Sequence, residues 1–204
     1  DLLTDVQLTE ACSTEEGKAG DIVGLAGCAA IRDLSCLVQL EQMQELDISG
    51  CTGIDATTVA KIVAENKTLS KLIFGARDEN SESESDSEQE YKWEPAVLEI
   101  GMTEAGFSNK NLGVGGAIIV SSWLTHKAVA DMTSLDISSN EIVSSEWMDP
   151  PRQDLKVGDL VDGNPISKID EDDGQVCVVD LSGIKALADA IPDMRALSTL
   201  VLSN

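Results

Sequence analysis

The chain repeats one spacing of apolar residues at an interval of 23 positions, and this repeat constrains its fold more than any other feature. The first copy consists of Val23, Leu25, Cys28 and Ile31, and the second of Leu46, Ile48, Cys51 and Ile54. Two apolar residues separated by one other residue point to the same side of a strand. The spacing therefore predicts short strands that each bury one face and are followed by an inward turn.

Further copies of this spacing follow along the chain. They are Leu69, Leu72 and Phe74, then Met132, Leu135, Ile137 and Asn140, then Leu197, Leu200 and Leu202, with a weaker copy at Ala105, Phe107, Lys110 and Leu112. The turn position holds Cys28, Cys51 or Asn140, whose side chains can bond to backbone groups that the turn would leave unpaired. We expect Cys28 and Cys51 to lie side by side as reduced thiols.

This spacing resembles the leucine-rich-repeat pattern, in which alternating leucines precede an asparagine or cysteine. The first copies resemble the subclass with repeats of about 22–23 residues, and the later ones resemble the ribonuclease-inhibitor-like subclass. The resemblance implies an α/β leucine-rich-repeat solenoid with short parallel strands on a concave face and helices or 3-10 turns on the convex face. It covers most of the chain apart from the first residues and two insertions.

The segments between the strands carry helix signals. Asp55 is a candidate N-cap for a helix over 56–65, and the apolar spacing from Ile184 to Ile191 predicts a second helix that ends at Pro192. A third helix is expected after Leu112, and apolar residues at every third position over 31–46 predict a 3-10-like return. The chain then divides into an N-terminal flank (1–20), repeats (21–76), an acidic disordered loop (77–92), repeats (93–143), an inserted loop and β-meander (144–180), and an incomplete repeat (181–204).

The acidic loop contains little that a core could bury, so we expect it to be disordered. Each of its serines has a carboxylate three residues later, which is the spacing that an acid-directed kinase recognises; these candidate phosphorylation sites are Ser81, Ser83, Ser85 and Ser87. A solvated linker without regulation is the alternative.

The second insertion alternates short apolar runs with turn residues, which predicts a projecting β-meander of two or three strands. The run from Asp170 to Gly174 resembles part of a calcium loop. The residue at the first ligand position would be Ile169, which has no oxygen to offer, so a β-turn is the better interpretation.

The formal net charge of −23 restricts the partners. Nucleic acid and anionic membrane surfaces need lysine and arginine, and only 14 basic residues are present without clustering. No apolar run is long enough to insert in a bilayer. We expect a protein partner with a basic or polar surface. The five cysteines are odd in number and lack close pairs, which indicates an intracellular reducing compartment, the cytoplasm or an organelle interior, rather than secretion.

No set of residues predicts catalysis, a cofactor or a metal site. His126 is the only histidine, and the glycines from Gly113 to Gly116 lack the lysine of a phosphate-binding loop. We therefore expect a non-catalytic interaction scaffold. The alternative is a regulator of an enzyme, such as a GTPase-activating protein, which would need a positioned polar or arginine side chain; the arginines are Arg32, Arg77, Arg152 and Arg195.

The outward positions of the predicted strands form the expected binding surface. These positions are Glu45, Asp47, Ser49, Lys71, Ile73, Ser134, Asp136 and Ser138. The aromatic residues Tyr91, Trp93 and Trp147 lie in or beside the insertions, where they either anchor a loop or contact a partner. Because the sequence stops midway through a repeat, at Leu202 to Asn204, we expect a subunit or fragment of a larger assembly.

Overall fold

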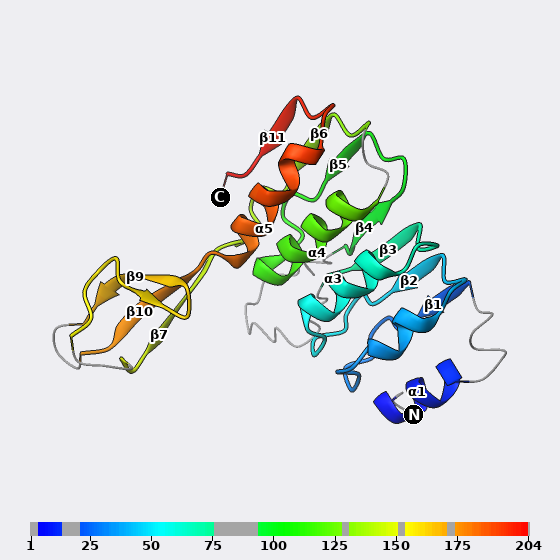
Figure 1. Cartoon of the computed structure of the whole chain (residues 1–204), viewed down its shortest axis with the longest axis horizontal. Helices are drawn as coiled ribbons and strands as arrows, with labels where there is room; N and C mark the ends of the chain where they lie inside the picture. Colours follow the sequence, from blue (N-terminus) through cyan, green and yellow to red (C-terminus); the bar gives the residue numbers. More distant parts are fainter. Residues whose placement is uncertain are drawn as a thin grey trace, which may run out of the picture.

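The computed structural model describes residues 4–13, 21–75, 94–127, 131–150, 154–170 and 174–203. Within them the chain is a mixed α/β protein with four α-helices and several small sheets (Figure 1). The helices are α1 (Asp5–Ser13), α3 (Ala56–Glu65), α4 (Gly113–His126) and α5 (Ser182–Ala190), with the 3-10 turns η1 (Ser35–Gln39) and η2 (Ile191–Asp193). The strands are β1 (Ile22–Gly24), β2 (Glu45–Asp47), β3 (Lys71–Phe74), β4 (Ala96–Glu99), β5 (Glu104–Gly106), β6 (Ser134–Asp136), β7 (Ser144–Met148), β8 (Leu160–Val161), β9 (Asn164–Ile169), β10 (Val176–Asp180) and β11 (Thr199–Val201).

Two of the sheets contain the strands that the repeat predicts. In the first, β1, β2 and β3 run parallel with Val23, Leu46 and Leu72 in register. The second has the order β11-β6-β5, also parallel, with Leu135 between Leu200 and Ala105. The equivalent repeat positions therefore pair within each sheet.

The predicted leucine-rich-repeat solenoid is nevertheless wrong as the fold class. Strand β4 joins the first sheet antiparallel to β3, with Leu98 opposite Leu72, and among the described residues β4 and β5 belong to different sheets. The parallel ladder is thus divided into two short runs, and antiparallel pairing occupies the border between them. Strand β4 runs in the direction opposite to β3. The repeat spacing predicts a return segment, not a strand, for these residues.

Helices α3, α4 and α5 cover one face of these two sheets (Figure 1). Helix α3 spans the predicted range and buries Val59, Ile62 and Val63, and its N-cap Asp55 accepts a hydrogen bond from the backbone N–H of Thr58 at 3.2 Å. Helix α4 is buried along most of its length because α3 and α5 pack on either side of it. One continuous core joins the helices to both sheets.

The described residues between 144 and 180 form a separate antiparallel sheet with the order β7-β10-β9-β8, which projects from the body of the molecule (Figure 1). It has four strands rather than the expected two or three, because β7 turns out to pair with β10. Its own small core contains Val161, Ile166 and Val176. This sheet is therefore packed on one face independently of the main core.

Candidate protein-binding surface

The first sheet presents one face that the helices do not cover, and we call its outward side chains the open face. One row across the four strands consists of Ile22, Glu45, Lys71 and Glu99, and the next consists of Gly24, Asp47, Ile73 and Val97. Alternate residues of the same strands, such as Leu46, Leu72 and Leu98, are fully buried on the opposite side. The open face thus combines a charged row with a row that ends in two apolar side chains.

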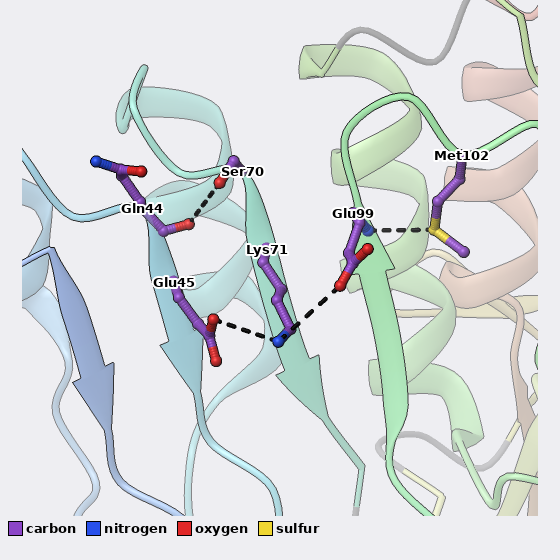
Figure 2. Close-up of polar contacts among 6 residues, drawn as sticks. All are labelled: Gln44, Glu45, Ser70, Lys71, Glu99 and Met102. Carbon is purple, nitrogen blue, oxygen red and sulfur yellow. Dashed lines mark hydrogen bonds and ion pairs between the residues drawn. The ribbon is translucent and has the colours of Figure 1, made fainter.

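Lys71 occupies the centre of the charged row. Its Nζ lies 3.3 Å from Oε2 of Glu45 on β2 and 3.9 Å from Oε1 of Glu99 on β4 (Figure 2). All three side chains remain partly exposed, so each ion pair contributes at most about 1 kcal/mol. Their main effect is on the character of the surface, because two carboxylates neutralise the single ammonium group between them.

Hydrogen bonds at the start of β3 fix the strands that carry this row. The Ser70 hydroxyl donates to the carbonyl oxygen of Gln44 at 3.1 Å, and the backbone N–H of Lys71 donates to the same oxygen at 3.0 Å. On β4 the N–H of Glu99 points to the sulfur of Met102 at 3.1 Å (Figure 2). The charged row is therefore held by backbone contacts on both sides of Lys71.

Two of the three serines predicted for the surface, Ser49 and Ser138, are engaged in turns instead of being free for a partner. Ser49 donates from its N–H and its hydroxyl to Asp47, at 2.9 and 2.7 Å, and Ser138 makes the same two bonds to Asp136 at the same distances. The hydroxyl of Ser138 also lies 2.9 Å from that of Ser108, and Ser138 is only 8% exposed. The aspartates remain on the surface, but Ser138 is not a contact residue.

The same aspartate–x–serine turn recurs at Asp33 and at Asp180, and the strand period did not predict it. Serine hydrogen bonds hold the pKa of Asp136 and the pKa of Asp180 below the ordinary value for a carboxyl group. The repeated triplet of aspartate, an aliphatic residue and serine was a signal that could have revealed it.

The remaining predicted surface residues, Ser134 and Asp136, lie on β6 of the second sheet. There Ser134 stands between Glu104 and Thr199, and Asp136 between Gly106 and Val201. The eight predicted positions are therefore shared between two sheets, and only Glu45, Asp47, Lys71 and Ile73 belong to the open face.

Two turn residues of the repeat, Asn140 and Cys51, bond to backbone groups as predicted. The side chain of Asn140 donates to the carbonyl of Phe107 at 2.7 Å and accepts from the N–H groups of Lys110 and Leu112 at 2.9 and 3.2 Å. The thiol of Cys51 donates to the carbonyl of Leu25 at 3.0 Å, and burial raises its pKa. Cys28 and Cys51 are free thiols, as expected.

Of the three aromatic residues predicted as partner contacts, Trp147 alone lies within the described residues, and it belongs to the projecting sheet rather than to the open face. It lies on β7 and is 47% exposed. Tyr91, Trp93 and the four candidate phosphorylation sites Ser81, Ser83, Ser85 and Ser87 lie outside the described residues.

A cavity of about 170 Å³ lies between α3 and α4. Its lining is mainly aliphatic, with Cys51 and Asn111 as the polar members and the early glycines of α4 on one wall. Gly113 begins this helix with φ +59°, and a Cβ on Gly116 would meet Cβ of Leu112 at 2.5 Å. The glycines thus serve the tight helix entry and close packing, and the cavity lining offers no acid–base pair.

Metal binding and membrane insertion find no support in the part of the chain that the structure describes. No group of three or more potential ligands gathers there, and His126 is exposed on the last turn of α4. None of the described helices is both long and apolar enough to cross a membrane.

Comparison with known proteins adds no identification. No protein-family model, curated protein or solved structure matches the chain. The resemblance to leucine-rich repeats therefore remains an interpretation of the sequence spacing.

Proposed function

We propose that this chain is a non-catalytic binding module that holds another protein against the open face of β1–β4. The observation that carries the proposal is the face itself: four strands in register present outward side chains, while α3, α4 and α5 pack on the other side. Such a solvent-facing sheet surface is available for contact with another protein.

The chemistry of the face defines the partner. Its outward positions carry the carboxylates of Glu45, Asp47 and Glu99 against the single ammonium group of Lys71. The whole chain adds a large negative charge, which accelerates encounter with positive surfaces and repels negative ones. The partner is a protein with a basic patch beside an apolar residue that packs on Ile73 and Val97.

The alternative of a GTPase-activating or similar regulatory role draws no specific support from the arginines. Arg32 packs its guanidinium group against Gly53, and Arg195 follows η2, so neither belongs to the strands of the open face. Arg77 and Arg152 lie outside the described residues. A reducing compartment of the cell remains our proposal for its location, because all five cysteines are free thiols.

Cross-linking mass spectrometry on the native assembly, followed by quantitative capture with the purified chain, tests this function. We expect Ile73→Glu and the double variant Glu45→Lys, Glu99→Lys to lose the cross-linked partner. The control is Glu65→Lys on α3, where the carboxylate is similarly exposed but lies on the helical side. Partner capture that survives the face variants and falls with Glu65→Lys would contradict the proposal.

A further inference from the structure

The projecting sheet has an open edge at β7. Strand β7 is paired only with β10 among the described residues, so half of its backbone N–H and C=O groups point away from the sheet. With five residues, Ser144–Met148, it is the longest edge strand of the described sheets; the others have two to four. An unpaired strand edge is a template for a further strand.

This edge has only one of the features by which proteins usually protect such strands, the charged side chain of Glu146. Short length, charged side chains (lysine above all), proline, bulges and covering loops are the common devices. Strand β8, the other edge of the same sheet, has only two residues, and the irregular register in this sheet lies between β10 and β9. Strand β7 contains no lysine or proline, and four of its five residues are exposed. None of the described strands therefore pairs with its outer edge.

Trp147 supplies an anchor on this strand. In the ladder it stands opposite Cys177, whereas the neighbouring pair of Met148 and Val176 belongs to the small core. Successive residues face opposite sides, so Trp147 points away from that core. A half-exposed tryptophan that the local core does not need is the residue type that most often dominates a protein interface. The exposure of Trp147 favours partner contact over loop anchoring as its role.

We propose that β7 binds an extended, basic segment of a partner protein by strand addition, with Trp147 as the side-chain anchor. The backbone edge supplies the hydrogen bonds and the alternating side chains supply selectivity, as in other cases of strand addition. This surface is distinct from the open face and extends the proposed function by a second binding mode.

Charge decides what occupies the edge. No lysine, arginine or histidine occurs from Asp131 to Pro150, whereas Glu141, Glu146 and Asp149 surround the strand. The nearest base in the ladder is Lys168, two strands away on β9. If a second copy of the chain paired with β7, Glu146 of one copy would lie opposite or near Glu146 of the other. The two carboxylates would repel each other, as would the two chains, each with a net charge of −23. A strand with lysine or arginine next to an apolar residue is the complementary occupant.

A displayed library of random peptides, selected on the purified full chain, tests the proposal. We expect enriched peptides in which basic and apolar residues alternate, with slower hydrogen exchange of residues 144–148 when the free synthetic peptide is bound. Methylation of alternate backbone nitrogens of the peptide should abolish binding, because strand addition needs those N–H groups. Trp147→Ala and Glu146→Lys should each weaken binding at least about tenfold.

Two matched variants serve as controls. Leu160→Ala removes an exposed apolar side chain from the opposite edge of the same sheet, and Glu104→Lys reverses a charge on β5. Both should bind the peptide like the unmodified chain, and so should Ile73→Glu, which separates this proposal from the open face. Enriched peptides that are acidic, that tolerate backbone methylation or that bind Trp147→Ala normally would overturn it. Concentration-dependent dimerisation that Glu146→Lys alters would instead assign the edge to a second copy.

Discussion

The replacement of Asn140 by alanine is expected to cause one of the largest losses of stability available in this chain. Asn140 is 1% exposed, and its amide bonds to backbone groups of two chain segments. Its oxygen accepts from the N–H groups of Lys110 and Leu112, and its nitrogen donates to the carbonyl of Phe107. Alanine removes all of these bonds without filling the space.

The magnitude follows from the groups left unpaired. A buried polar group without a partner costs about 1–3 kcal/mol. Leu112 is buried and Lys110 is half-buried, so we take one full and one partial cost for the two N–H groups, together on the order of 3 kcal/mol. This is a large part of the roughly 5–15 kcal/mol that stabilises a typical domain.

Urea denaturation followed by circular dichroism measures the loss. The comparison is Cys51→Ala at the equivalent repeat position, where one thiol bond to Leu25 is lost from a half-buried site and we expect no more than about 1 kcal/mol. If Asn140→Ala costs as little as Cys51→Ala, the amide does not satisfy the buried backbone groups and the argument is refuted.

Three further predictions test other parts of the structure. Gly183→Ala should destabilise the protein by about 1–3 kcal/mol in the same assay, because the new Cβ would lie 2.7 Å from the carbonyl oxygen of Ile142. The control is Gly106→Ala, where the new Cβ has no atom within 4 Å and the loss of stability should be much smaller. Ser138→Ala should raise the pKa of Asp136 in an NMR titration, because the variant loses the hydroxyl that donates to this carboxylate. In the wild type, the lowered pKa of Asp136 stabilises the folded state above pH about 3.9, the pKa of an aspartate in the unfolded chain, and this stabilisation disappears as the pH falls through the pKa of the folded state. The variant should therefore lose this part of the acid dependence of its stability. Burial and the neighbouring Cys12 thiol raise the pKa of Cys36 to about 12. Cys36 should therefore resist alkylation by iodoacetamide in the folded protein and react after unfolding, as measured by mass spectrometry.

The sequence predicts the individual strands better than their assembly. Apolar alternation located β2, β3, β6 and β11, and helix signals located α3 and α5. Alternation has the same period in parallel and antiparallel strands, so it contains no information on direction. The side chains from Ala96 to Glu99 alternate between buried and partly or fully exposed positions as in the other strands. The 33-residue interval from Leu72 to Ala105 nevertheless suggested only an insertion and a return segment. No local pattern in the sequence sets the direction in which β4 pairs with β3.

The surface was predicted less well than the core for a related reason. Alternation places Ser49 and Ser138 outward, two residues after each aspartate. The strand ends there, and the serine turns back to bond to the aspartate, because short polar side chains compete for nearby backbone and carboxylate groups. A rule based on the period of a strand fails at the residue where the strand stops. Trp147 could be singled out from its type alone, but its side of the sheet required the register with Cys177.

The unexpected strand also changes the chemistry of the candidate site. Without β4, Lys71 would face only Glu45 across the ladder, and the two charges would balance. Antiparallel pairing brings Glu99 to the other side of Lys71, and with Asp47 in the next row the open face carries three carboxylates against one ammonium group. The selectivity that we propose for basic partners thus depends on the strand whose direction the repeat did not predict. Glu99→Gln should therefore weaken partner binding more at low salt than at high salt, because the lost interaction is a screened charge rather than a packing contact.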